Sequence, residues 1–164
     1  MKVDFSGAEI RIFDFDELEA YRIARKIEED GIYYYSRMKE EMLKPEIRNV
    51  IEMLLKDERN HLDLFERRIE ELAAKHDVVD EGETLADIVD SKVMDVLSDS
   101  ERVADILCNP QEAIRLGMSV EKRSIAFYGQ ILQSTQDKTG KATIEELIEQ
   151  EKEHLRKLEG FLRR

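Results

Sequence analysis

The segment EAYRIARKIEEDGIYYY (residues 19–35) returns in altered form as EAIRLGMSVEKRSIAFY (residues 112–128). The two segments match at Glu, Ala, Arg, Glu, Ile and Tyr, and each matching pair lies 93 positions apart. The apolar residues of the first segment recur at intervals that place them on one face of a helix. The repeat therefore predicts two related amphipathic helices, one in each half of the chain.

The same offset of 93 positions extends to a second pair of segments. Glu58-Arg59-Asn60-His61 corresponds to Glu151-Lys152-Glu153-His154, with a glutamate three positions before a histidine in both. Three further matches join Leu54 to Leu147, Leu62 to Leu155 and Glu66 to Glu159. We interpret this pattern as the internal duplication of a helical hairpin, which repeats polar residues that are costly to bury.

Capping signals predict four long helices. In chain order, they run from Asp16 with Glu19 to about Lys39 or Met42, from Pro45 to about Lys75, from Asn109-Pro110 to Ile131 or Gln133, and from Thr143 with Glu146 to the C-terminus. A polar side chain at a helix start accepts a backbone hydrogen bond, and a proline fits the first turn because it lacks an N–H. Only two prolines and seven glycines interrupt the chain, which favours long elements.

A long connection, residues 77–108, joins the second predicted helix to the third. It contains helically spaced apolar residues and a further capping pattern, which predict one or two short helices: Leu85, Ile88, Val89 and Val93, then Ser98 with Glu101. Short links within each hairpin and one long link between them are typical of a four-helix bundle with a crossover. We therefore expect a single all-α domain over residues 1–164.

The composition disfavours several classes of function. The 164 residues include 38 acidic and 26 basic ones, giving a net charge of −12, which disfavours nucleic acids and anionic membranes because both are polyanions. The chain has no run of 18 apolar residues and no apolar stretch typical of a signal peptide in its first ten residues, so we expect a cytoplasmic protein. The single cysteine, Cys108, cannot form an internal disulfide, and its neighbours Ile106 and Leu107 predict a buried side chain.

Two of the three histidines lie in the repeated Glu-x-x-His pattern. Residues three apart share one face of a helix, so each pattern directs a carboxylate and an imidazole to one point. Two hairpins packed face to face would bring six polar residues into the core: Glu28, Glu58, His61, Glu121, Glu151 and His154. Four buried carboxylates are costly unless neutralised, and two divalent cations would neutralise them. Carboxylate and imidazole ligands favour iron or manganese, with zinc as a substitute.

These motifs, together with Tyr35 and Tyr128, resemble the rubrerythrin branch of the ferritin-like superfamily, and the resemblance covers all four predicted helices. It implies a ferritin-like four-helix bundle that holds two iron ions. The ligand roles it implies are terminal for Glu28 and Glu121, bridging for Glu58 and Glu151, and one histidine per metal for His61 and His154. The two tyrosines lie two turns beyond the terminal glutamates and would hydrogen-bond to the ligands.

The chain departs from the rubrerythrin pattern in two places. Rubrerythrins carry an extra glutamate three residues after the ligand of the third helix. Here that position is Ser124, and its counterpart in the first helix is Gly31. Rubrerythrins also carry a rubredoxin-like iron site of four cysteines, whereas this chain has one cysteine. Electrons would therefore come from a separate donor, such as a rubredoxin-like protein or a reductase.

The resemblance implies an oxidoreductase that reduces hydrogen peroxide or dioxygen in defence against oxidative stress. Three alternatives stay open: a ferroxidase or iron carrier, a bundle that metal ions only hold together, and an oxygenase with an organic substrate. Tyr33 and Tyr34 lie off the ligand face and are expected to pack in the interior or at an interface, and we expect a homodimer. The sequence assigns no role to residues 1–13 or to the connection at 77–108.

Overall fold

The computed structural model describes residues 2–4, 11–76, 97 and 100–163 of the chain. This part of the chain contains five α-helices and two short strands. In chain order they are β1 (Lys2–Asp4), β2 (Arg11–Phe13), α1 (Glu17–Glu41), α2 (Pro45–His76), α4 (Ser100–Leu107), α5 (Pro110–Ser134) and α6 (Lys138–Leu162). The all-α fold class that the sequence predicts is confirmed.

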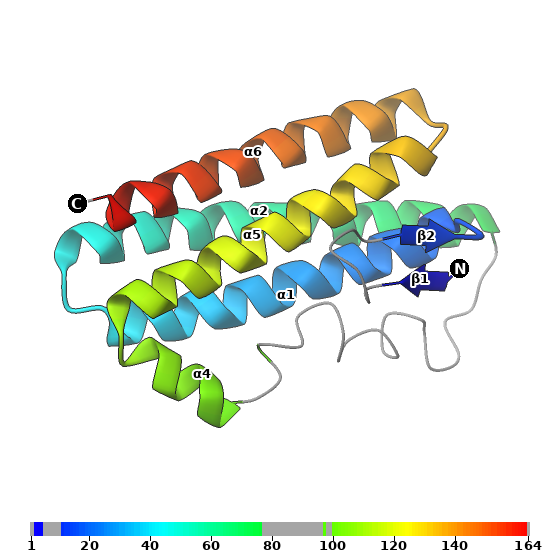
Figure 1. Cartoon of the computed structure of the whole chain (residues 1–164). Helices are drawn as coiled ribbons and strands as arrows, with labels where there is room; N and C mark the ends of the chain where they lie inside the picture. The colour runs from blue at the N-terminus through cyan, green and yellow to red at the C-terminus, as the bar shows by residue number, and fades with distance from the viewer. Residues whose placement is uncertain (1, 5–10, 77–96, 98–99, 164) are drawn as a thin grey trace.

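The four long helices lie side by side (Figure 1). α1 packs along α2 and α5 packs along α6, so each half of the sequence repeat forms one helical hairpin. α1 also contacts α5, and α2 contacts α6, which brings the two hairpins together. The short helix α4 lies against α5 and α1 and confirms one helix in the connection. The helical pattern at 85–93 and the cap at Ser98 lie outside the described residues.

The long helices begin where polar side chains supply missing backbone partners. At the start of α1, Asp16 accepts a hydrogen bond from Glu19 N (2.8 Å), and at the start of α5, Asn109 accepts one from Gln111 N (3.0 Å). Pro45 is the first residue of α2. These starts agree with the predicted ones, and the ends of α1, α2 and α5 each fall within one residue of a predicted end.

The predicted start of the last helix was wrong. α6 begins at Lys138, five residues before the Thr143 and Glu146 pattern, because Asp137 caps it by accepting a hydrogen bond from Gly140 N (2.9 Å). Lys138, Thr139 and Gly140 therefore belong to the first turn of the helix, where polar side chains are tolerated on the exposed face.

Buried apolar side chains fill the space between the long helices on both sides of their midpoints. Tyr21 and Phe65 lie toward one end, and Met38 and Ile51 lie toward the other, all of them at most 1% exposed. Burying side chains of this size is worth roughly 1.5–3 kcal/mol each, so the packing of amphipathic faces stabilises the helices. The midpoints themselves are occupied by polar residues.

Outside the four long helices, two features differ from the sequence analysis or add to it. β1 and β2 form an antiparallel ribbon that places Val3 opposite Ile12, and both side chains pack against the core. Cys108 is exposed, contrary to the predicted buried side chain, because it lies between the end of α4 and Asn109, the cap of α5. Among the described residues, no helix combines the length and apolar character that crossing a membrane requires.

Candidate metal centre

Six ionisable side chains are buried near the midpoints of the four long helices. They are Glu28 on α1, Glu58 and His61 on α2, Glu121 on α5, and Glu151 and His154 on α6. None is more than 4% exposed. The structure thus brings together all six residues that the sequence repeat singles out. Burying this many ionisable groups is costly unless charges or hydrogen bonds compensate, so their mutual geometry decides what the cluster can do.

The six side chains form two groups that share two members. The groups are Glu28, Glu58, His61 and Glu151, and Glu58, Glu121, Glu151 and His154. In each group, every residue offers one ligand atom, and these atoms all lie within 4.8 Å of one another. Carboxylate oxygens and imidazole nitrogens that converge in this way can hold a divalent metal ion.

The shared residues Glu58 and Glu151 turn one carboxylate oxygen toward each group. Glu58 Oε2 lies 3.7 Å from His61 Nδ1, and Glu58 Oε1 lies 3.3 Å from His154 Nδ1. Glu151 Oε1 lies 3.1 Å from His61 Nδ1, and Glu151 Oε2 lies 3.1 Å from His154 Nδ1. Both carboxylates therefore have the orientation that bridging two neighbouring cations requires.

Glu28 and Glu121 each belong to one group. Their Oε2 atoms lie 3.5 Å and 3.8 Å, respectively, from Nδ1 of the histidine in the same group. The Oε1 atom of Glu121 accepts a hydrogen bond from the Tyr35 hydroxyl, and Oε1 of Glu28 accepts one from the Tyr128 hydroxyl. Each tyrosine thus orients a carboxylate of the opposite hairpin, as expected for residues that hydrogen-bond to ligands.

The two histidine rings are stacked, with centroids 5.9 Å apart and an interplanar angle of 25°. Nδ1 of each ring faces the carboxylates, and Nε2 faces outward. His61 Nε2 lies 2.8 Å from Gln150 Oε1, and His154 Nε2 lies 3.2 Å from Asp57 Oδ2. Both partners are hydrogen-bond acceptors, so we assign a ring proton to Nε2 of each histidine.

Burial makes Glu28 and Glu121, the carboxylates that belong to one group each, hard to ionise in the absence of a cation. Burial is the largest cause that raises the pKa of Glu28 from 4.5 to about 8, and the charge of Glu58 is the second. His61 offsets only part of this shift. Burial, followed by the charges of Glu151 and Glu58, raises the pKa of Glu121 well above its ordinary value. Both groups would release a proton when a metal ion binds.

The pKa values of the two shared carboxylates, Glu58 and Glu151, and of the two histidines are shifted toward the charged forms. Burial and the charge of Glu151 raise the pKa of Glu58, but its contacts with Glu28 and both histidines outweigh them and hold it below 4.5. The pKa of Glu151 is lowered in the same way, because the histidines outweigh burial. Burial lowers the pKa of His61 and His154, yet the surrounding carboxylates outweigh it and raise both. Positive charge at the centre is therefore strongly favoured.

Three buried ligand atoms lack hydrogen-bond geometry with any residue that the structure describes. They are Glu28 Oε2, His61 Nδ1 and Glu151 Oε1, all from one group. His61 Nδ1 lies 3.5 Å from Glu28 Oε2 and 3.1 Å from Glu151 Oε1, so the three atoms converge. Buried polar atoms without a hydrogen bond are rare in folded proteins, and oxygen and nitrogen atoms of these types are metal donors. The residues present therefore fit a divalent cation.

The structure also places residues near the centre that the sequence analysis did not single out. Asp57 and Gln150 were missed, although they lie 93 positions apart and each directly precedes a glutamate shared by the two groups. Tyr34 is buried and donates to Ala113 O (2.5 Å), which confirms its packing role, whereas Tyr33 is 47% exposed.

Neither Ser124 nor its counterpart Gly31 adds a ligand to the cluster. Ser124 Oγ donates to Val120 O of its own helix (3.3 Å) and not to the cluster. A Cβ at Gly31 would lie 3.9 Å from Glu58 Oε2, so this position faces the bridging carboxylate without contributing a donor atom.

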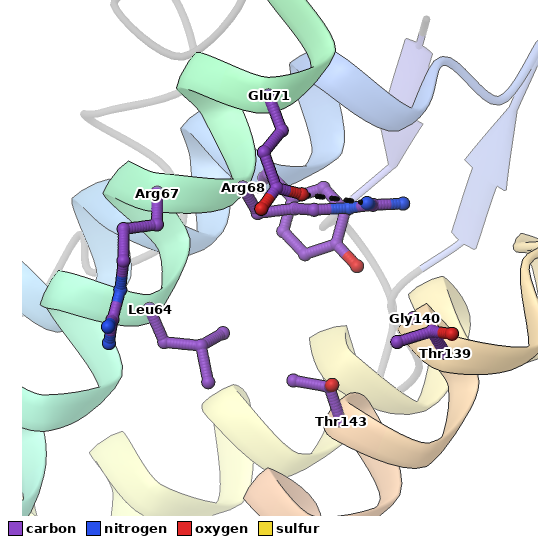
Figure 2. A pocket seen from close by; sticks show the side chains of 8 residues that line it. Leu64, Arg67, Arg68, Glu71, Thr139, Gly140 and Thr143 are labelled. Carbon is purple, nitrogen blue, oxygen red and sulfur yellow. Dashed lines mark hydrogen bonds and ion pairs between the residues drawn. The ribbon is translucent and has the colours of Figure 1, made fainter.

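A separate pocket of about 310 Å³ opens between α1, α2 and α6 (Figure 2). Its lining consists of Tyr21, Leu64, Arg67, Arg68, Glu71, Thr139, Gly140 and Thr143. Only one of these residues has a carboxylate, so the pocket is not a second metal centre. The Arg68 guanidinium pairs with Glu17 (3.0 Å), Asp137 (3.1 Å) and Glu71 (3.2 Å), so carboxylates already balance its charge.

The pocket and the centre are connected by aromatic contacts. Tyr21, in the pocket wall, packs against Phe65 with ring centroids 5.8 Å apart, and Phe65 packs against Tyr128 at 5.5 Å. Tyr128 in turn donates its hydroxyl to Glu28. These contacts fix the ring that orients the Glu28 carboxylate.

Comparison of the chain with protein-family models, with curated proteins and with solved structures finds no match.

Proposed function

We propose that the chain is a di-iron carboxylate protein with a ferritin-like four-helix bundle and a long crossover between α2 and α5. The observation that carries the proposal is the orientation of Glu58 and Glu151, each of which directs one oxygen to each donor group. Four carboxylates bring four negative charges, and two divalent cations would balance them in a site where unbalanced charge is costly.

Each residue of the cluster has a role in this proposal. Glu28 and Glu121 are terminal ligands, one for each metal, and the two histidines bind through Nδ1. Tyr35 and Tyr128 hold the terminal carboxylates, because burial raises the pKa of both phenols well above 10 and keeps them as hydrogen-bond donors. Iron and manganese suit this mixture of oxygen and imidazole ligands, and zinc is a substitute.

The reaction that we propose is the reduction of hydrogen peroxide or dioxygen. Two ferrous ions would supply one electron each to hydrogen peroxide, which takes up two protons and yields two water molecules. The protein provides six ligand side chains and excludes bulk water, since none of them is more than 4% exposed. Gly31 and Ser124 stand where further carboxylates could lie, so they would leave bound metal ions accessible to the oxidant.

Electrons for repeated turnover would come from a separate donor, a rubredoxin-like protein or a reductase, in the cytoplasm. The chain has one cysteine, so it does not contain the four-cysteine iron site that serves this purpose in rubrerythrins. Cys108 is exposed, whereas all six proposed ligands are buried. It therefore takes no part in the proposed centre.

The test is stopped-flow absorbance of anaerobically Fe²⁺-loaded protein mixed in parallel with hydrogen peroxide and with dioxygen. Oxidation that is much faster with peroxide, with iron retained by the protein, is the expected result. Iron content is measured after gel filtration before and after the reaction. A protein that takes up no iron would reject the proposed centre, and bound iron that reacts with neither oxidant would reject the redox function while leaving the metal centre.

A ferroxidase or iron carrier is the second candidate function, and Asp57 favours it. This side chain is 31% exposed, and Oδ2 lies 3.2 Å from Nε2 of the buried His154, so a carboxylate connects solvent with the centre. An iron carrier needs such a connection, because ions must enter and leave its centre, whereas a peroxidase retains its iron. This function predicts faster oxidation by dioxygen, release of ferric iron, and more than two irons processed per chain in the same experiment.

A further inference from the structure

Asp57 and Gln150 occupy the same place in the two hairpins. Each directly precedes a bridging glutamate, and the two lie 93 positions apart, the offset of the whole repeat. Each also contacts the outward ring nitrogen of the histidine from the other hairpin: Asp57 Oδ2 lies 3.2 Å from His154 Nε2, and Gln150 Oε1 lies 2.8 Å from His61 Nε2. The geometry is therefore repeated, but one partner is a carboxylate and the other a neutral amide.

This difference bears on how strongly each histidine binds a cation. Nδ1 of both rings faces the donor groups, so the ring proton stays on Nε2 and is donated to Asp57 or Gln150. A carboxylate acceptor draws that proton more strongly than an amide does and makes the imidazole a better ligand. It also adds a negative charge close to the metal position, which an amide does not.

The two donor groups form the two halves of the centre, one with His61 and one with His154, and their direct ligands are alike. Each half has one terminal glutamate, one histidine and the same two bridging carboxylates, and a tyrosine from the other hairpin orients each terminal glutamate. The hydrogen-bond partner of the histidine is thus a difference that falls directly on a ligand.

Resting on the metal centre proposed above, we infer that the two halves bind divalent cations unequally. The half that contains His154 fills first, because Asp57 supports its imidazole. Changes to hydrogen-bond partners of metal-binding histidines typically alter affinity by about 10–100-fold. Asp57 is 31% exposed, and solvent screens part of its charge, so we expect a difference near the lower limit, about tenfold.

The test uses Zn²⁺ as a redox-inert probe and the metal-free protein comprising residues 1–164. Isothermal titration calorimetry is expected to resolve a tighter and a weaker binding event. In parallel, ¹⁵N spectra of histidine-labelled protein follow the ring nitrogens of the three histidines. With Zn²⁺ below one equivalent, the His154 Nδ1 resonance is expected to shift before that of His61.

Two isosteric exchanges and a control make the inference specific. Asp57→Asn should weaken the tighter event about tenfold and bring the two affinities together. Gln150→Glu should instead strengthen the weaker event, and the double variant should reverse the order in which the two histidine resonances shift. Asp63→Asn removes a charge from an exposed position of the same helix and should leave both events unchanged.

The outcomes separate this inference from the proposed centre. Binding of two Zn²⁺ with equal affinities that neither Asp57→Asn nor Gln150→Glu changes would overturn the inference and leave the centre in place. A shift of His61 before His154 in the wild-type protein would also overturn it. Absence of Zn²⁺ binding to the wild-type protein would reject the metal centre and this inference with it. Loss of peroxide reactivity alone would bear on the redox function and not on the difference between the halves.

Discussion

Hairpins α1–α2 and α5–α6 carry the same residues at the buried centre and different ones directly beside it. A buried carboxylate costs free energy in each helix that contains it, yet each hairpin has two at the centre together with one histidine. Neighbouring positions differ instead: Asp57 corresponds to Gln150, and Gly31 to Ser124. The comparison teaches that the donor set acts as a unit across both hairpins, while its surroundings distinguish the two halves.

The strongest way to break this unit is to remove a shared residue. Glu58→Ala is expected to abolish binding of both metals, because one carboxylate directs an oxygen to each half. Glu28→Ala should remove only one metal, since Glu28 belongs to one donor group. Metal content per chain after loading and gel filtration measures both results.

A matched control for these variants is Glu66→Ala, an exposed glutamate on α2 that is also repeated at Glu159. It should bind as much metal as the wild-type protein. Two metals retained per chain in Glu58→Ala would contradict the bridging role. Equal losses in Glu58→Ala and Glu28→Ala would contradict the division into shared and terminal ligands.

The pH dependence of stability distinguishes protons from metal ions as the neutralising charge. In the metal-free protein, the raised pKa of Glu28 (about 8, against 4.5) means that the folded state binds more protons than the unfolded state between these values. Stability from such a group is complete below its unfolded pKa and is lost as pH rises through its folded pKa. The raised pKa of His61 acts in the same direction above pH 6.5, its ordinary value.

Glu58 and Glu151 act in the opposite direction, because their pKa values are lowered and their contribution is lost as pH falls below 4.5. The metal-free protein is therefore expected to be most stable at about pH 5 and to lose stability toward pH 8. Added Zn²⁺ should stabilise more at pH 8 than at pH 5, since it replaces protons. Thermal unfolding across this range, with and without Zn²⁺, measures both trends, and a metal-free protein whose stability rises from pH 5 to 8 would contradict the argument.

Much of the fold could be predicted because its signals are local. Asp16 and Asn109 cap helices within their own sequence neighbourhood, so the starts of α1 and α5 were predicted correctly. The start of α6 was missed although its cap, Asp137, is equally local, because the Thr143 and Glu146 pattern was taken as the cap. Arg68 from α2 also holds Asp137. Contacts between distant helices do not appear in the spacing of one segment.

The candidate site divides in the same way. The six donors could be singled out because the 93-position repeat marks them, and the structure brings them together. Asp57 and Gln150 obey the same offset, but a polar residue beside a glutamate is common in an acidic chain. Their importance depends on the packing of α2 against α6, which brings each to the opposite histidine.

Smaller effects test whether Tyr35 and Tyr128, which each donate a hydrogen bond to a carboxylate of the opposite hairpin, support Zn²⁺ binding. Tyr35→Phe and Tyr128→Phe should each weaken Zn²⁺ binding in one half by about 1.5–3 kcal/mol, the usual worth of a hydrogen bond to a charged group. Tyr34→Phe is the matched control, because its hydroxyl donates to Ala113 O and not to a ligand. It should cost about 1 kcal/mol of stability and leave Zn²⁺ binding unchanged. Titration calorimetry and thermal unfolding measure the two effects, and weaker Zn²⁺ binding in Tyr34→Phe would contradict a specific role for the other two.

The smallest expected effect comes from adding a methyl group at Gly31, the counterpart of Ser124. A Cβ at Gly31 would meet Glu58 Oε2 at 3.9 Å, which is ordinary van der Waals contact, so Gly31→Ala fits without displacing the bridging carboxylate. Glycine within a helix is less favourable than alanine by roughly 0.5–1 kcal/mol. The variant should therefore unfold about 1–4 °C higher and bind Zn²⁺ as before.

Gly117→Ala is the informative contrast, because it adds the same methyl group where space is short. Its Cβ would lie 3.3 Å from Tyr35 Cε1 and 3.4 Å from the Tyr35 hydroxyl oxygen, so the ring that orients Glu121 has to move. The gain in helix propensity is then offset by strain, and Zn²⁺ binding in the Glu121 half should weaken. Equal stability gains and unchanged Zn²⁺ binding in both variants would show that the position of the Tyr35 ring does not control the Glu121 carboxylate.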